Sequence, residues 1–254
     1  MDPATLIGIV VAFGALIAML TIEGSNVTAI LHPAPMVLVF FATIAVGIAG
    51  GTIKDLIMAL KAIPGAFKGK TTHPQEIIDR VVSLAEKARS EGLLSLEQEA
   101  DDVEDPFLRR ALQNIADGTD GEDLRILLED EIETSAKSGR TAARFFTSMG
   151  GYAPTIGIIG TVVSLTHVLE NLSTPATLGP MIASAFVATL WGLLSANFLW
   201  LPIGARLKRL TDLEVERMSL LMEGVLAVQA GSQPRLLGER LRAMVPASAL
   251  SAAA

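Results

Sequence analysis

Two apolar segments decide the fold of this chain: PTIGIIGTVVSLTHVL at residues 154–169 and LGPMIASAFVATLWGLLSANFLWLP at residues 178–202. A short loop, 170–177, joins them, and neither segment contains Asp, Glu, Lys or Arg. A helix needs roughly 20 apolar residues to cross a bilayer core about 30 Å thick. Each segment is therefore predicted to cross a membrane as one helix.

Two further windows, 3–22 and 24–53, also lack charged residues. The chain is 50% hydrophobic and only 19% charged, with a mean hydropathy of +0.48, well above a soluble domain of this size. The first window has no basic stretch or A-x-A-like cleavage site around it, which favours a retained span over a signal peptide. We predict four spans, near Ala4–Ile22, Pro35–Thr52, Met149–Leu169 and Leu178–Ile203.

The composition argues against several classes of function. The chain has no cysteine, which excludes thiol nucleophiles and Cys-based metal sites, and its three histidines are not at metal-ligand spacing. A net charge of −7 gives no support for nucleic-acid binding. We therefore expect no enzyme, no metal site, no cofactor and no nucleic-acid partner.

The distribution of Lys and Arg predicts the orientation. Thirteen of the 20 lie within 54–144 and the other seven lie from Arg206 onward, whereas the loops 23–34 and 170–177 have none. Basic residues stay on the cytoplasmic side of a membrane, so both termini and the 54–144 insert are predicted to be cytoplasmic. The predicted divisions are 1–53 (spans 1 and 2), 54–144 (helical insert), 145–205 (spans 3 and 4) and 206–254 (helical tail).

Helix signals continue through the insert, so the fold class is an all-α membrane protein. Pro64-Gly65 is predicted to stop an extension of the second span. Pro74 opens an amphipathic helix that Gly92 ends. Asp105-Pro106 caps a further helix, and Asp120 caps a last one that runs into the third span. The third and fourth spans are thus extended by long helices.

Arg89 and Glu97 stand on either side of Gly92. Two interpretations are open. Exposed opposite charges beside a tight connection can form a docking face for a charged partner, or they can belong to an ordinary solvated helical surface.

Small residues share one face of each of the last two spans. A helical wheel aligns Gly157, Thr161 and Ser164, with Gly160 beside them, and aligns Ala185, Thr189, Gly192 and Ala196. Small faces allow close helix packing in lipid, while hydroxyls can also line an ion path. Spacing alone leaves both interpretations open.

A carboxylate is missing from all four predicted spans. Ion relays in membranes usually use a buried Asp or Glu. If this chain conducts an ion, we expect another subunit to supply that group.

PTIGIIGTVVSL and ASAFVATLWGLLSAN-x₄-PI resemble the signature of flagellar motor stator A subunits, the MotA/PomA family. EGVLAVQAGSQPR (223–235) resembles that family's tail segment, and KARSEGLLSLE (87–97) its cytoplasmic motif. The resemblance covers nearly the whole chain, although TVVSL alone would also suit the related ExbB/TolQ energisers.

The resemblance implies a multi-pass protein of the cell membrane that conducts ions and drives motility. Five copies would surround two B subunits, whose single span supplies the ion-carrying Asp and whose periplasmic domain anchors to peptidoglycan. The insert would drive the rotor switch protein. By position, it implies rotor contacts for Arg89 and Glu97 and pathway roles for Pro154, Thr161, Ala188, Thr189 and Pro202.

Two departures from the family pattern bear on the ion and the packing. Ala188 stands where sodium-type members carry Thr, which removes one oxygen ligand and favours H⁺ over Na⁺. Ser164 stands where Gly is usual. Two alternative functions stay open: an ExbB/TolQ-type energiser of an outer-membrane system, and a membrane scaffold that conducts nothing.

Overall fold

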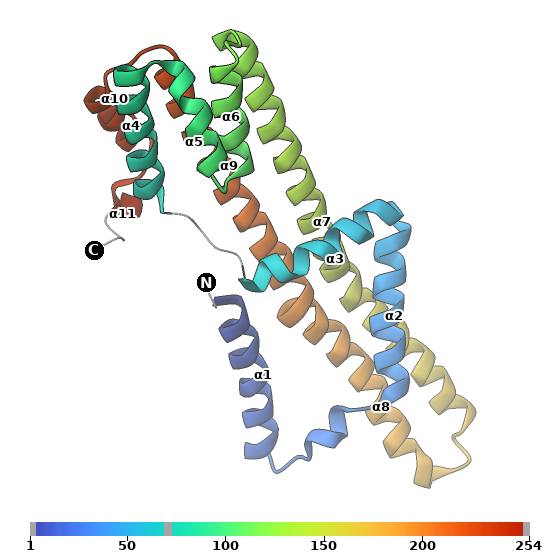
Figure 1. The fold of residues 1–254 in the computed structure, drawn as a ribbon. Helices are drawn as coiled ribbons and strands as arrows, with labels where there is room; N and C mark the ends of the chain where they lie inside the picture. The colour runs from blue at the N-terminus through green and yellow to red at the C-terminus, as the bar shows by residue number, and fades with distance from the viewer. Residues whose placement is uncertain (1–3, 69–72, 251–254) are drawn as a thin grey trace. The chain divides into compact units, whose positions relative to one another are not determined.

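The computed structural model describes residues 4–68 and 73–250, and every regular element in those ranges is a helix (Figure 1). The all-α prediction is confirmed. The elements are α1 (Ala4–Ile22), η1 (Val27–Ile30), α2 (Pro33–Ala49), α3 (Ile53–Lys68), α4 (Pro74–Glu91), η2 (Leu93–Ser95), α5 (Leu96–Asp102), α6 (Pro106–Ala116), α7 (Gly121–Glu170), α8 (Pro175–Leu194), η3 (Ser195–Trp200), α9 (Leu201–Gln229), α10 (Pro234–Ala243) and α11 (Ala247–Leu250).

The chain divides into two compact units. The first contains Met1–Gly69 and Ser138–Leu210, and the second contains Lys70–Lys137 and Thr211–Ala254. The division falls inside α7 and again inside α9, because α7 and the continuous helical stretch Pro175–Gln229 are both much longer than a membrane span.

Three helical stretches of the described ranges are long and apolar enough to cross a membrane: Ala4–Ile22, Gly121–Glu170 and Pro175–Gln229. The fourth predicted span corresponds to α2, an apolar helix of 17 residues. At about 1.5 Å per residue this is near the lower limit for crossing a bilayer. The number of spans therefore stays a prediction.

The prediction that the second span continues until Pro64-Gly65 is wrong. Helix α2 ends at Ala49, and α3 begins at Ile53 as a separate helix. Thr52 and Asp55 cap α3 reciprocally: the Asp55 carboxylate accepts from the Thr52 N–H at 2.8 Å, and the Thr52 hydroxyl accepts from the Asp55 N–H at 3.2 Å. Pro64 lies inside α3 on its exposed side, where the lost backbone hydrogen bond is not buried in the protein.

The predicted caps of the second unit are confirmed. Helix α4 begins at Pro74 and is followed by Gly92. The Asp105 carboxylate accepts from the first N–H groups of α6, 2.9 Å from Phe107 N, and Asp120 accepts from Glu122 N at 2.9 Å. The helices bury one shared core whose largest fully buried side chains are Ile78, Val81, Leu84, Leu96, Leu112, Ile115, Leu124, Leu128, Leu237 and Leu241.

In the first unit, α2 packs against α8 around Val39 and Trp191. The Trp191 indole donates to the Ile30 carbonyl at 2.6 Å, which ties η1 to α8. Thr43 is a further residue of α2. Its side chain is fully buried, and its hydroxyl forms no hydrogen bond with a described residue. A threonine within a helix usually bonds the carbonyl one turn back, and Thr43 departs from that expectation.

Candidate functional site

Backbone contact between α7 and α8 brings the two small-residue faces together. A Cβ added to Gly157 would lie 2.9 Å from the Ala188 carbonyl oxygen, and one added to Gly192 would lie 3.0 Å from the Gly157 Cα. No larger residue fits either place without moving backbone. Gly157 and Gly192 therefore set the distance between the helices.

One turn along α7, the contact places two hydroxyls together. Thr161 Oγ1 lies 2.5 Å from Thr189 Oγ1, 2.9 Å from the Ala185 carbonyl oxygen and 3.2 Å from the Gly157 carbonyl oxygen. Both threonines are half-buried. The side chains that the sequence places at the centre of its two apolar segments thus form one hydrogen-bonded pair.

Either hydroxyl of this pair can be the donor of the hydrogen bond between them. A threonine hydroxyl has one proton and two lone pairs. When Thr161 donates to the Ala185 carbonyl, Thr189 donates to Thr161, and the lone pairs of Thr189 Oγ1 can accept from a donor outside the chain. When Thr161 instead donates to Thr189, the Thr189 proton is available to an outside acceptor. The pair can therefore exist with either hydroxyl as the donor, so Thr189 can offer an outside group either a lone pair or a proton.

Gly160 and Ala185, two of the other predicted packing positions, also lie at this contact. Gly160 approaches Ala188, since a Cβ on Gly160 would stand 3.0 Å from the Ala188 Cβ. Ala185, Ala188 and Ala196 are buried, and Ser164 is half-buried. Ala188 thus lies between α7 and α8 within one chain, next to the threonine pair.

The two predicted pathway prolines lie inside helices, Pro154 in α7 and Pro202 in the first turn of α9. Each lacks a backbone N–H, so the helix loses one backbone hydrogen bond at each proline. The elements touch near these points: a Cβ on Gly150 would stand 2.5 Å from a Leu201 side-chain carbon.

Sequence periodicity missed a π-helical turn, η3, between α8 and α9. Within η3, Ser195 is fully buried and Asn197 is exposed, with its amide donating to the Leu193 carbonyl at 2.9 Å. Single π-turns inside α-helices are frequent at functional sites. The polar Asn197 in an apolar segment was the one available signal.

The predicted rotor-contact residues lie in the second unit, at the connection between α4 and α5. Gly92 has a φ of +87°, a left-handed conformation that favours glycine, and it turns the chain from α4 into η2. Arg89 and Glu97 are both exposed. Neither forms an ion pair with a described residue, so both charges face outward from this unit.

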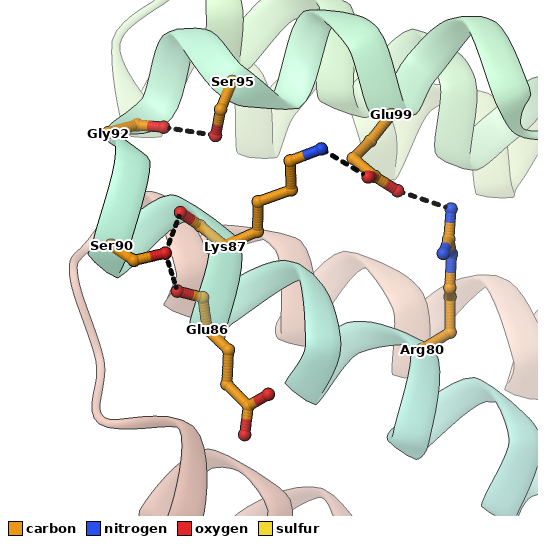
Figure 2. Close-up of polar contacts among 7 residues, drawn as sticks. All are labelled: Arg80, Glu86, Lys87, Ser90, Gly92, Ser95 and Glu99. Atoms are coloured by element: carbon orange, nitrogen blue, oxygen red, sulfur yellow. Dashed lines mark hydrogen bonds and ion pairs between the residues drawn. The ribbon is translucent and has the colours of Figure 1, made fainter.

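Glu99 of α5 links this helix to α4 through two ion pairs, as Figure 2 shows. Its carboxylate accepts from Lys87 Nζ at 2.7 Å and from Arg80 Nη2 at 2.9 Å. The hydrogen bond from Lys87 lowers the pKa of Glu99, with further help from the Arg80 charge, and the same bond raises the pKa of Lys87. Ser90 and Ser95 add hydrogen bonds to nearby backbone carbonyls.

Two family models match this chain, each over a different region. Residues 99–220 match the model of the MotA/TolQ/ExbB proton channel family. Residues 6–92 match the model for the motility protein A N-terminal region. The two matches together cover most of the chain.

Similar curated proteins extend over nearly the full length. Motility protein A of Bacillus subtilis is 34% identical over 252 residues, covering 97% of this chain and 92% of the relative. Motility protein A of Treponema phagedenis is 37% identical, covering 95% and 93%. Chemotaxis protein PomA of Vibrio alginolyticus is 30% identical, covering 95% and 94%.

Two solved structures share the fold. The structure of C. jejuni MotAB matches with a TM-score of 0.93 at 27% identity, over 97% of both chains. The flagellar MotAB stator complex from Bacillus subtilis matches with a TM-score of 0.90 at 33% identity, over 99% of both chains.

Proposed function

Because this chain belongs to the MotA/TolQ/ExbB proton channel family, we propose that it acts as the ion-channel subunit of a flagellar stator and forms one wall of a proton path. The observation that carries the proposal is the Thr161–Thr189 hydroxyl pair, 2.5 Å apart in two charge-free segments. Hydroxyls at this depth can hydrogen-bond water or a passing ion.

The wall needs a partner. Buried carboxylates are the usual carriers in membrane ion paths, and the uncharged segments of this chain contain none. We infer that a B-type stator subunit supplies an Asp from a single span and anchors the complex to peptidoglycan. The related structures are MotAB complexes, which supports a B-type partner. Five copies of this chain would surround two B subunits.

The proposed membrane placement has four spans in the cytoplasmic membrane, built from α1, α2, the later part of α7, and α8 with η3. The second unit and both termini lie in the cytoplasm, because Lys and Arg gather there. Helix α2 crosses as a short span, and its loop is tied down by the bond from Trp191 to Ile30. Within this placement 54–144 is the rotor domain and 206–254 the tail.

Protons are the proposed ion. A hard cation such as Na⁺ needs several oxygen ligands. Next to the threonine pair, Ala188 offers no side-chain oxygen and is buried between α7 and α8. The two hydroxyls of the pair are better suited to passing a proton along hydrogen bonds than to surrounding a cation with oxygen ligands.

Torque would reach the rotor through the connection at Gly92. Arg89 and Glu97 are exposed and free of ion pairs within the described residues, so their charges can address the rotor switch protein. Glu99 holds α4 and α5 together behind them. Proton flow through the first unit would thereby turn the second unit against the rotor.

A direct test expresses the chain with a B-type subunit in a cell that lacks both stator genes. Restored swimming, together with proton uptake by vesicles that contain both chains, supports the proposal. Proton uptake without swimming, in a strain with an intact rotor, contradicts the motor role. Assembly of the complex without any ion flux would favour the scaffold instead.

An ExbB/TolQ-type energiser is the alternative within the same family. The full-length relatives named above are motility and chemotaxis proteins, and α1 with α2 lies within the match to the motility protein A N-terminal model. Both observations favour the stator.

A further inference from the structure

A groove with a volume of about 480 Å³ opens in the first unit between α1 and the η3–α9 segment. This volume is in the range of ligand sites, about 300–1,000 Å³. Its lining is mostly apolar and comprises Ala4, Thr5, Gly8, Ile9, Ala12, Asn197, Phe198, Pro202 and Arg206.

On the α1 side the groove is open because several of the side chains that line it are small. Ala4, Gly8 and Ala12 follow one another at intervals of four residues and so lie on one side of the helix. A Cβ on Gly8 would meet nothing within 4 Å. The space beside Gly8 is therefore open, in contrast to the filled contact at Gly157.

The opposite wall changes character along its length. Phe198 packs edge-to-face on Phe13, with ring centroids 5.4 Å apart, beside the Ala12 end of the groove. Pro202 and Arg206 follow at helical spacing. Arg206 is the first charged residue after the uncharged run 171–205, and its Nε donates to the Ala66 carbonyl at 3.4 Å. The groove thus has an apolar body and a guanidinium at one end.

We propose that this groove binds an anionic phospholipid of the membrane, with its phosphate on Arg206 and an acyl chain along the Ala4–Ala12 wall. A guanidinium forms charge-assisted hydrogen bonds with phosphate, and basic pockets between membrane helices on the cytoplasmic side bind acidic headgroups. The apolar body of the groove selects a lipid over a free phosphate ion. The inference rests on the membrane placement proposed above and is independent of the motor role.

The test uses the complete complex with its B-type subunit, purified in mild detergent. It is incubated with equal amounts of phosphatidylglycerol and phosphatidylcholine of identical acyl chains, washed, and its retained lipid is counted by native mass spectrometry. The wild-type complex is expected to retain phosphatidylglycerol in preference. One basic residue near the surface changes affinity for an acidic lipid about fivefold, so Arg206→Gln should lower phosphatidylglycerol retention by about that factor. Lys208→Gln, which removes a neighbouring charge outside the groove, should not.

A second pair of variants tests the acyl wall without changing any charge. Gly8→Leu places a side chain in the groove and should reduce retention of the lipid. Gly14→Leu is the matched control, because a Cβ there also meets nothing within 4 Å and Gly14 does not line the groove. These variants keep the test decisive where Arg206→Gln fails to assemble.

Three results would overturn the proposal: equal retention of both lipids by the wild type, unchanged retention in Gly8→Leu, or equal losses in Arg206→Gln and Lys208→Gln. A neighbouring protein chain that fills the groove would give the second result. Proton uptake is measured on the same preparations. A complex that binds the lipid selectively but conducts nothing would contradict the proton path and leave the lipid site standing.

Discussion

Gly157 of α7 and Gly192 of α8 are in backbone contact, such that a Cβ on Gly192 would stand 3.0 Å from the Gly157 Cα and 2.8 Å from the Ala153 carbonyl oxygen. Helices that touch at glycine bring their neighbouring side chains within hydrogen-bonding distance. Thr161 lies one turn after Gly157 on α7, and Thr189 lies close to Gly192 on α8. The glycine contact therefore explains why the two threonines share a hydrogen bond.

The first prediction concerns this contact. Gly157→Ala should destabilise the complex by about 1–3 kcal/mol, because the added carbon meets backbone atoms that must move. Gly151→Ala is the matched control on the same helix. No atom lies within 4 Å of its added carbon, and replacing a helical glycine should stabilise by up to about 1 kcal/mol. Thermal unfolding of the purified complex measures both, and equal stability of the two variants would refute the contact.

Charge reversal at the Gly92 connection tests the docking face. Arg89→Glu should impair swimming while proton uptake stays normal, because the exposed side chain belongs to the second unit. Exposed ion pairs contribute about 0–1 kcal/mol and reversal adds a repulsion of similar size, so rotor binding should weaken by about 30-fold or less.

Two controls accompany that reversal. Arg235→Glu makes the same charge change on α10, where the side chain is highly exposed, and it should swim normally. A compensating charge on the rotor should rescue Arg89→Glu. Normal swimming of Arg89→Glu in every rotor background would rule out the docking role.

Glu99 predicts a pH dependence. Its pKa is lowered in the folded protein, chiefly by the hydrogen bond from Lys87. Its contribution to stability is therefore complete above its ordinary pKa of 4.5 and is lost as the pH falls through the lowered value.

Glu99→Gln does not titrate, so the wild type should exceed it in stability by a constant amount above about pH 5. The difference should shrink as the pH falls below 4.5. Unfolding of both complexes across a pH series measures this, with Glu97→Gln as an exposed control. A difference that is the same at every pH would show that the Lys87–Glu99 pair does not form.

Chemistry between neighbouring residues predicted most helix boundaries. Asp105 and Asp120 each cap a helix that starts at the next residue, so the signal lies within a few positions of sequence. The break after Ala49 was missed because it falls in an uncharged run where hydropathy indicates one continuous helix. The reciprocal cap between Thr52 and Asp55 starts the new helix α3 at the end of that uncharged run.

Contacts between distant residues were harder to predict. Periodicity places Thr161 and Thr189 each on a small-residue face, but it does not say which residue of α8 lies opposite Gly157. Glu99 likewise finds its partners 12 and 19 residues away, and η3 leaves no periodic trace. The roles of Arg89, Glu97 and the pathway residues stay predictions, because they depend on other chains.

Sodium replacement tests the ion. With K⁺ substituted for Na⁺ in the medium, cells that swim with this stator should continue at the same speed, whereas a proton uncoupler should stop them. Ala188→Thr restores a hydroxyl beside the threonine pair and serves as the comparison variant. Arrest of the wild type on removal of Na⁺ would contradict the proton path.

Proton uptake by vesicles that contain this chain and its B-type partner tests the central claim most directly. Thr189→Val keeps the side-chain shape and removes the hydroxyl, and loss of this partly buried hydrogen bond costs about 1–3 kcal/mol, so uptake should fall by about 5- to 150-fold. Thr189→Ser should stay close to wild type, and so should Thr166→Val, whose hydroxyl bonds only within its own helix among the described residues. Wild-type uptake by an assembled Thr189→Val complex would contradict the account.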